Sequence, residues 1–195
     1  MIKLLLFIGI VLSASCERKP ATADQVLTEV KNEEVAPEAD KTLTVNNTPI
    51  AHTPGSIINT GNTTPSQLVA FAKKMIGTPY LYGSTNPANG FDCSGFITYV
   101  FNEFNISVPR SSIDFTNVER AIPLNEAKEG DIVLFTGTNA NIREVGHMGI
   151  IVSEGSPKEF IHSTSGKAYG VTITPLNEYY MGRFVKVLRI FKQND

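Results

Sequence analysis

The order of the apolar segments is the feature that most limits the fold of this chain. Two stretches with helical spacing come first, at residues 64–76 and 91–104. Short runs rich in Val, Ile, Phe and Thr follow, at residues 131–135, 145–152, 159–164, 169–176 and 183–191. Helices followed by consecutive strands are typical of an α+β domain. We therefore expect N-terminal helices packed on a small antiparallel β-sheet.

Both helical stretches carry signals for where they begin. Thr64 followed by Pro65 and Gln67 is the pattern of a capping box with proline at the first helical position. Asp92 is a plausible cap for the second helix. This start places Cys93 at or next to a helix N-terminus.

The first 15 residues have the layout of a signal peptide. Lys3 precedes an apolar run from Leu4 to Leu12, too short for a bilayer that needs roughly 20 helical residues. The small residues before Cys16 resemble the lipobox of bacterial lipoproteins, although Ser13 stands where that motif usually has Leu. The resemblance implies that Cys16 becomes the lipidated N-terminus and anchors the protein to a membrane.

Residues 17–62 have a different composition from the rest of the chain. They contain no Phe or Tyr, and they carry seven acidic and four basic residues. A segment so poor in large apolar groups cannot offset its ordering entropy, so we expect a flexible acidic tether with a reach of about 35–40 Å. The sequence thus divides into a signal peptide (1–15), a lipidated Cys and tether (16–62) and a folded domain (63–195).

Charge and cysteine content exclude several classes of protein. The net charge is −2, and residues 63–195 carry twelve acidic and twelve basic residues, so there is no basic surface for nucleic acid. Two cysteines, Cys16 and Cys93, cannot build a disulfide framework or a four-thiolate zinc site. We expect no metal or cofactor, and a monomer is favoured.

Cys93 is the most informative residue of the folded domain. The positive end of a helix dipole lowers the pKa of a thiol, and we expect this effect here. Small or polar neighbours, Asp92, Ser94 and Gly95, would leave the sulfur accessible. The alternative is a buried cysteine that packs as a small hydrophobic residue.

Two histidines are candidates for the base that a cysteine nucleophile needs. His147 and His162 lie on consecutive predicted strands, and we expect them to be neighbours in the sheet. Gly146 and Gly149 beside His147 would let a substrate or a helix approach the strand closely. The alternative is that each histidine only satisfies a backbone carbonyl. With Cys93, the pair would supply a nucleophile, a general base and a group that orients the base.

Taken together, these residues and their neighbours make the sequence resemble a known family. Its motifs occur in the order and approximate spacing of the NlpC family of bacterial cell-wall cysteine peptidases, over residues 64–191: GTPYLYGS (77–84), FDCSGF (91–96), VPRSS (108–112), GDIVLF (130–135), GHMGIIV (146–152) and FIHSTS (160–165). The resemblance implies a papain-like fold. It also implies Cys93 as nucleophile, His147 as general base and acid, His162 as the residue that orients it, and Tyr80 beside the oxyanion or substrate.

Further site residues follow from the same resemblance. Asp92 and Ser94 flank the thiol, as they do in the family, where such neighbours line the substrate groove. The stretch Arg110, Ser111 and Ser112 matches the family and would form the groove or its support. This chain departs from the family at Gly83-Ser84, where two glycines are usual, and in a longer hairpin between the histidines. No wall-binding module precedes the domain in residues 17–62.

The implied function is that of an exported lipoprotein of the bacterial envelope, expected at the outer membrane and facing the periplasm or the cell surface. It would hydrolyse amide bonds in peptidoglycan stem peptides, next to D-glutamate and diaminopimelate. Two alternatives remain open. One is another amide-processing enzyme on the same scaffold, such as a CHAP-type amidase or a peptidase of host or rival peptides. The other is a wall-binding lipoprotein without catalysis.

Overall fold

The computed structural model describes residues 56–118, 120–139 and 141–195. The predicted signal peptide, Cys16 and most of the tether lie outside the described residues. The helices and strands, in chain order, are α1 (Pro65–Lys73), β1 (Thr85–Asn86), β2 (Gly90–Phe91), α2 (Cys93–Asn102), β3 (Ala121–Ile122), β4 (Ile132–Thr136), β5 (Val145–Ser153), β6 (Glu159–Thr164), β7 (Gly170–Pro175), α3 (Glu178–Arg183) and β8 (Phe184–Leu188).

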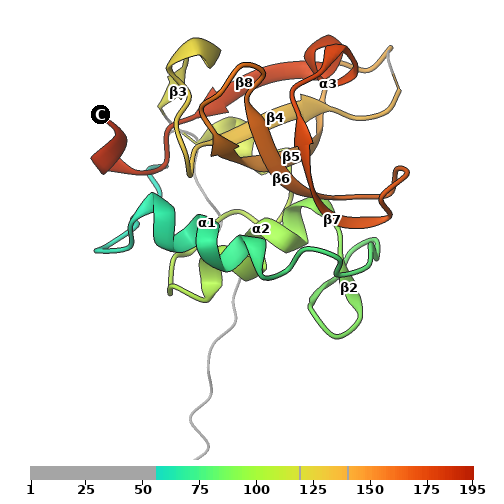
Figure 1. Cartoon of the computed structure of the whole chain (residues 1–195), viewed down its shortest axis with the longest axis horizontal. Helices are drawn as coiled ribbons and strands as arrows, with labels where there is room; N and C mark the ends of the chain where they lie inside the picture. Colours follow the sequence, from blue (N-terminus) through green and yellow to red (C-terminus); the bar gives the residue numbers. More distant parts are fainter. Residues whose placement is uncertain (1–55, 119, 140) are drawn as a thin grey trace, which may run out of the picture. The chain divides into compact units, whose positions relative to one another are not determined.

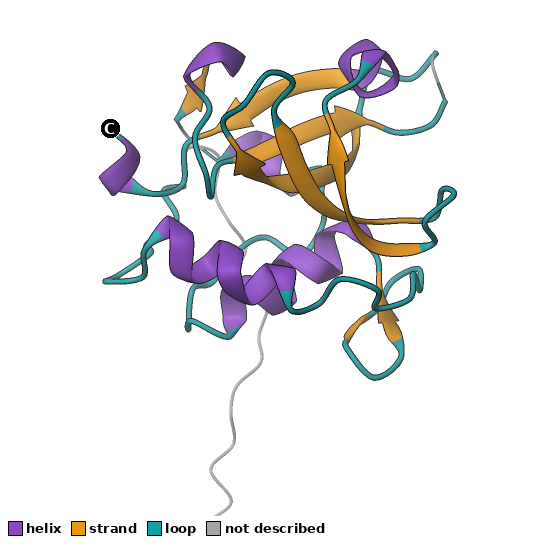
Figure 2. Cartoon of the chain, viewed as in Figure 1, coloured by secondary structure: helices purple, strands orange, loops and turns teal. Residues whose placement is uncertain are grey.

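The main layer is a six-stranded antiparallel sheet with the strand order β3-β8-β4-β5-β6-β7. Figure 1 shows α1 and α2 together on one side of this sheet, while α3 lies away from them. The separation of helices from strands is clear in Figure 2. The expected α+β arrangement, with N-terminal helices on an antiparallel sheet, is confirmed.

Helix α1 begins as its sequence predicts. The Thr64 hydroxyl accepts a hydrogen bond from the backbone of Gln67, and the Gln67 side chain accepts one from the backbone of Thr64. These bonds satisfy two of the donors that a helix start leaves without partners. The α-helix ends at Lys73, short of the expected Ile76, and the chain continues in turns to Gly77.

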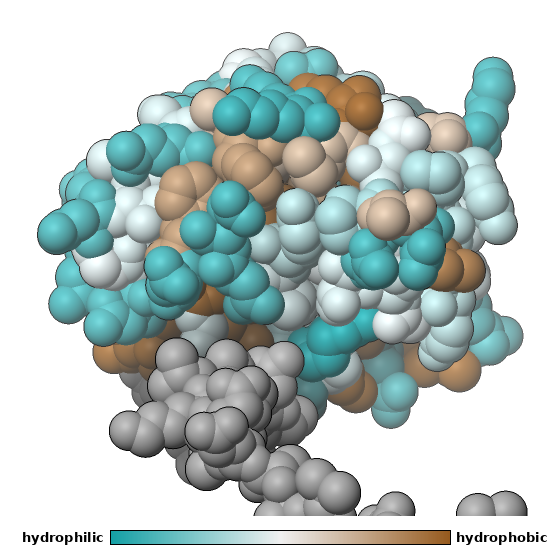
Figure 3. All heavy atoms as spheres, turned by 90° about the horizontal axis from the view of Figure 1, so that it is seen from below, coloured by the Kyte–Doolittle hydropathy of each residue, from teal (hydrophilic) through white to brown (hydrophobic). Residues whose placement is uncertain are grey.

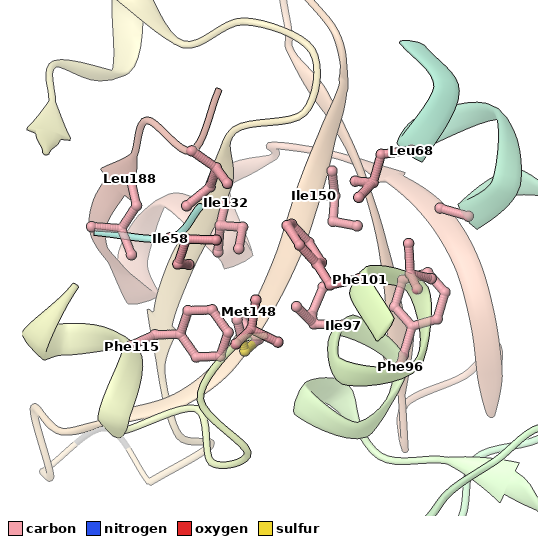
Figure 4. Packing of buried hydrophobic residues seen from close by; sticks show 14 of the residues in the cluster. Ile58, Leu68, Phe96, Ile97, Phe101, Phe115, Ile132, Met148, Ile150 and Leu188 are labelled. Atoms are coloured by element: carbon pink, nitrogen blue, oxygen red, sulfur yellow. The ribbon is translucent and has the colours of Figure 1, made fainter. Parts of the chain in front are cut away.

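The main core lies between the two helices and the sheet. Ile97 and Phe101 of α2 point toward Met148 and Ile150 of β5, and all four side chains are fully buried (Figure 4). Burial of one such side chain stabilises the fold by roughly 1.5–3 kcal/mol. This contact fixes α2, and with it Cys93, against the centre of the sheet.

A smaller apolar cluster covers the other face of the sheet. Successive side chains of a strand point to opposite faces, so Phe135 of β4 and Phe160 of β6 pack here against Tyr180 of α3. Helix α3 was not predicted from the sequence. Its six residues begin after Asn177, whose side chain accepts a hydrogen bond from the backbone of Tyr180.

The folded body begins earlier than residue 63, where we expected the tether to end. Ile58 is 6% exposed and belongs to the main core, and Ser56 forms a bridge with Val118. The average composition of residues 17–62 concealed this apolar anchor. Residues 56–62 are therefore part of the domain.

The coloured part of the surface in Figure 3, seen from below the view of Figure 1, is mostly hydrophilic with smaller apolar patches. Within residues 56–118, 120–139 and 141–195, no helix is both long enough and apolar enough to cross a bilayer.

Candidate active site

Cys93 is the first residue of α2, as predicted. Asp92 caps the helix, because its carboxylate accepts a hydrogen bond from the backbone N–H of Gly95. Gly95 is required by close packing, since an added Cβ would overlap the carbonyl oxygen of Ser84. The loop before the helix is thus pressed onto its first turn.

Arg110 stabilises the first turn of α2 through hydrogen bonds. Its guanidinium donates hydrogen bonds to the Asp92 carboxylate at 3.0 Å, to the Ser94 hydroxyl at 2.9 Å and to the Gly83 carbonyl at 2.9 Å. The side chains of Asp92 and Ser94 are buried and do not line the cavity in front of Cys93. The structure therefore gives Asp92, Ser94 and Arg110 contacts that support the helix start.

The two serines after Arg110 also lie apart from the cavity lining. Ser111 donates a hydrogen bond to Asp114 at 2.6 Å, at the start of a short 3-10 helix, Asp114–Asn117. Ser112 is half-buried. A groove role for Ser111 and Ser112 stays a prediction from the family resemblance.

His147 and His162 lie on the adjacent strands β5 and β6. Their rings are joined by a hydrogen bond of 2.8 Å between Nε2 of His147 and Nδ1 of His162. The expectation that they are neighbours in the sheet is confirmed. The other nitrogen of His162, Nε2, lies 2.9 Å from the hydroxyl of Thr174 on β7.

Aromatic rings enclose this histidine pair. The Tyr180 ring lies 5.5 Å from that of His162 and 6.2 Å from that of His147, and the Phe160 ring lies 4.5 Å from His162. Burial, followed by the positive charge of Arg183, lowers the pKa of His162 to about 3. Burial, followed by the charges of His162 and Arg183, lowers the pKa of His147 well below its ordinary value. Both imidazoles are therefore neutral at physiological pH.

The glycines beside His147 allow neighbouring parts of the chain to approach closely. An added Cβ on Gly149 would overlap Phe160 and the Ile161 carbonyl, and one on Gly146 would overlap the backbone of Gly137. Among the described residues, strand and hairpin residues approach at these points, and not a helix as we had considered. Because Gly146 also lines the cavity, the approach of a substrate there stays a prediction. Gly146 also lies at a register shift between β4 and β5, and such bulges recur next to active sites.

The cysteine and the histidine pair meet at one cavity of about 1130 Å³, lined by Cys93, His147 and Tyr80 among others. The Cys93 sulfur lies 3.9 Å from the carbonyl oxygen of Gly146, the residue before His147. A buried hydrogen bond of 2.7 Å from Ser163 to the Phe91 carbonyl ties β6 to the start of α2. In the part of the chain that the structure describes, no cluster of three or more His, Cys, Asp and Glu could hold a metal ion.

The expected lowering of the Cys93 pKa was wrong. Burial, followed by the negative charge of Asp92, raises the pKa of the thiol to about 11. The backbone N–H groups of Cys93 and Ser94 act in the expected direction, and so does Arg110, but these effects are smaller. Two neutral partners, a thiol and an imidazole, therefore face the cavity at rest.

Tyr80 lies at the cavity on the side of Cys93. Its backbone N–H donates to the carbonyl of Tyr169 at 3.1 Å, and its segment forms a bridge with Phe91. Burial, then the charges of Cys93 and Asp92, raise the pKa of its hydroxyl. A protonated phenol can donate a hydrogen bond, and Tyr80 lines the same cavity as Cys93.

Several residues of the site were missed in the sequence. Thr174, Tyr180, Arg183 and Lys167 line the same cavity. Arg183 donates to the carbonyl of Thr136 at 2.7 Å and to the hydroxyl of Tyr179 at 2.7 Å. The sequence did offer one signal for α3: a capping asparagine followed by two tyrosines and an arginine. Six residues, however, are too few to show the spacing of a helix.

Comparison with known proteins gives one consistent result. The model of the NlpC/P60 family matches residues 77–189. The chain is 30% identical over 184 residues to the "Probable endopeptidase NlpC homolog" of Haemophilus influenzae, with 93% of each chain covered. It is 31% identical to the "Gamma-DL-glutamyl hydrolase" of Bacillus subtilis, covering 66% of this chain and only 30% of that protein.

The fold gives the same answer. A crystal structure of an NlpC/P60 family protein from Bacillus cereus superposes with a TM-score of 0.59 and 26% identity, covering 68% of this chain and 42% of the other. The predicted papain-like fold is confirmed by this similarity. The chain therefore belongs to the NlpC/P60 family.

Proposed function

We propose that the protein is an exported, lipid-anchored cysteine peptidase that hydrolyses amide bonds in peptidoglycan stem peptides, between D-glutamate and diaminopimelate. The observation that carries this proposal is the meeting of Cys93, at a helix N-terminus, with the hydrogen-bonded pair His147 and His162 at one cavity. Membership of the NlpC/P60 family and the named hydrolase relatives support the same reaction class.

In the proposed reaction, His147 is the general base. As the Cys93 sulfur attacks the scissile carbonyl, the thiol proton passes to Nδ1 of His147, because Nε2 is already bonded to His162. The C–N bond then breaks, and His147 returns the proton to the leaving amine. Water hydrolyses the remaining thioester, which releases a carboxylic acid and restores the thiol.

The tetrahedral oxyanion needs donors in place before the reaction. The candidates are the hydroxyl of Tyr80, which lines the same cavity as Cys93, and the backbone N–H groups at the start of α2. Such preorganised donors supply a large part of the catalysis in acyl transfer, about 10²–10³ in kcat for one donor. The high thiol pKa fits a mechanism in which the proton leaves during the attack.

The charge of the cavity supports an acidic substrate. Among the described residues that line it, Lys167 and Arg183 are the only charged side chains, and none is acidic. The D-glutamate and diaminopimelate residues of a stem peptide carry free carboxylates. Cationic side chains in a partly enclosed cavity would attract such peptides and hold them in register.

The lipid anchor is proposed from the sequence alone, at Cys16. A tether of about 40 residues between the lipid and the first described residue would let the domain search nearby wall polymer. In cells, Cys16→Ser should move the protein from the membrane fraction to the soluble fraction, and mass spectrometry of the native N-terminal peptide should show acylation of Cys16. An unacylated Cys16 would contradict the anchor without affecting the peptidase proposal.

The central test is digestion of defined stem peptides by the full-length protein, followed by mass spectrometry of the fragments. We expect cleavage after D-glutamate, with a new amine on diaminopimelate, and no fragments with Cys93→Ala. Peptides with and without a free N-terminal L-Ala show whether that end is required. Fragments that persist with Cys93→Ala would overturn the choice of nucleophile.

The same digest separates the alternatives. A CHAP-type amidase would cut the link between sugar and peptide in intact wall fragments and leave a free lactyl carboxylate. A binding protein would retain wall fragments and release no new amine. Each of these results has a distinct product mass, so one experiment decides among the three.

A further inference from the structure

The hydrogen-bonded row that begins at His147 does not end at His162. Nε2 of His147 contacts Nδ1 of His162 at 2.8 Å, and Nε2 of His162 contacts the Thr174 hydroxyl at 2.9 Å. His162 is fully buried. Among the described residues, its two ring nitrogens therefore have one partner each, a base on one side and a hydroxyl on the other.

The sheet register explains why Thr174 reaches the ring. His162 lies opposite Thr172 in the pairing of β6 with β7, and Phe160 lies opposite Thr174. Thr174 is thus the diagonal neighbour of His162 on the same face, a distance that a long side chain spans. Thr174 is also one of the residues that line the cavity, so the row runs from the base to the cavity lining.

The role of this hydroxyl follows from the number of protons in the row. A neutral imidazole has one N–H donor and one acceptor nitrogen. For Nδ1 of His147 to accept the thiol proton, its Nε2 must carry the hydrogen and donate it to Nδ1 of His162. The proton of His162 must then lie on Nε2, where the oxygen of Thr174 accepts it.

The opposite direction of the hydrogen bonds, from Thr174 toward His147, would stop the reaction. If the Thr174 hydroxyl donated a hydrogen bond to Nε2 of His162, that ring would carry its hydrogen on Nδ1 and donate a hydrogen bond to Nε2 of His147. Nδ1 of His147 would then be an N–H group, which cannot accept a proton from Cys93. Burial keeps both rings neutral. Each ring therefore carries a single N–H, and the two tautomers stay distinct.

We propose that Thr174 is a positioning residue that accepts a hydrogen bond from Nε2 of His162 and thereby fixes the tautomers of both histidines. The inference rests on the proposed peptidase function, which requires Nδ1 of His147 to accept the thiol proton, while the structure supplies the hydrogen-bonded row itself. Without the hydroxyl, the Nε2–H of His162 loses the acceptor that it has among the described residues, and the tautomer needed for catalysis becomes less favourable.

A matched pair of substitutions tests this role in the full-length protein. Thr174→Val keeps the branched shape and removes the hydroxyl, whereas Thr174→Ser keeps the hydroxyl and removes the methyl group. We expect Thr174→Val to lower kcat for stem-peptide cleavage about tenfold to hundredfold with little change in KM. Thr174→Ser should retain kcat within about threefold. Equal activity of all three proteins would overturn the proposal.

A spectroscopic measurement tests the tautomer directly and needs no turnover. In Cys93→Ala protein labelled with ¹⁵N in its histidine rings, we expect NMR to show His162 protonated on Nε2. Adding Thr174→Val should introduce the Nδ1 tautomer. Protonation of His162 on Nδ1 with Thr174 present would overturn the proposal, even if Thr174→Val fails to fold. Absence of stem-peptide cleavage by the unmodified protein would instead refute the proposed function and leave this measurement valid.

Discussion

The cavity has two walls that hold their reactive groups in different ways. The helix wall consists of Cys93, which lines the cavity, and of Asp92, Ser94 and Arg110, which form a hydrogen-bonded network behind it. The sheet wall, His147, His162 and Thr174, is a neutral row covered by the aromatic ring of Tyr180.

The difference separates two ways of controlling a proton. On the helix wall, the nearest charge, Asp92, works against thiolate formation, and burial adds to it. On the sheet wall, burial keeps both imidazoles unprotonated. The reactive groups of both walls, the thiol and the two imidazoles, are therefore held in their uncharged forms, and we infer that the proton crosses between them only when the substrate is attacked.

The largest expected effect tests whether the two walls act as one unit. Cys93→Ala and His147→Ala should each lower kcat for stem-peptide cleavage by about 10⁴-fold or more, because neither wall catalyses alone. The double variant should be no slower than the worse single variant. Far-UV circular dichroism of all three proteins checks that the fold is kept, and a double variant whose loss equals the product of the single losses would show two independent contributions.

A smaller effect concerns the close packing of the helix wall. Gly95→Ala should lower the free energy of unfolding by about 3 kcal/mol, because the new methyl group must displace the Ser84 carbonyl. Gly182→Ala in α3 is the matched control, since its added Cβ has no heavy atom within 4 Å. Denaturant unfolding measures both. If the two variants have equal stability, the first turn of α2 is less tightly held than the structure indicates.

The sheet wall should show its burial in the pH dependence of stability. Below about pH 6.5 the histidines of the unfolded chain become protonated, whereas those of the folded protein stay neutral, since the pKa of His162 is lowered to about 3. The free energy of unfolding should therefore fall with decreasing pH, by up to about 1.4 kcal/mol per pH unit for each histidine.

Comparison with His162→Gln isolates this effect from the titration of carboxylates. Urea unfolding at pH 7.5, 5.5 and 4.5 should give a smaller pH slope for His162→Gln than for the unmodified protein. Equal slopes would mean that His162 takes up a proton in the folded state as it does in the unfolded chain. The conclusion that burial keeps the histidines neutral would then be wrong.

The smallest effect concerns the charge behind the thiol. Asp92→Asn keeps a capping side chain and removes the charge that raises the Cys93 pKa. Alkylation of Cys93 by iodoacetamide at pH 8, followed by mass spectrometry of its peptide, should be about fivefold faster. Asp114→Asn, a distant carboxylate bonded to Ser111, should alkylate at the unmodified rate. An unchanged rate for Asp92→Asn would leave burial as the whole cause.

Features that depend on neighbours in the chain could be predicted. The capping box of Thr64 and Gln67, the Asp92 cap and the position of Cys93 all involve residues within three places of one another. The pairing of His147 with His162 was also within reach, because consecutive strands usually pair. Helix α3 was not, since a six-residue helix has almost no period to read.

The sequence by itself determined the order of helices and strands, the helix starts, and which cysteine and histidines could react. The tertiary structure decided their chemical state. Cys93 has a raised pKa because distant segments bury it, and His162 finds Thr174 because β7 pairs beside β6. The reason is physical: caps and strand patterns arise from adjacent residues, whereas desolvation and hydrogen-bond partners depend on residues that only the folded chain brings together.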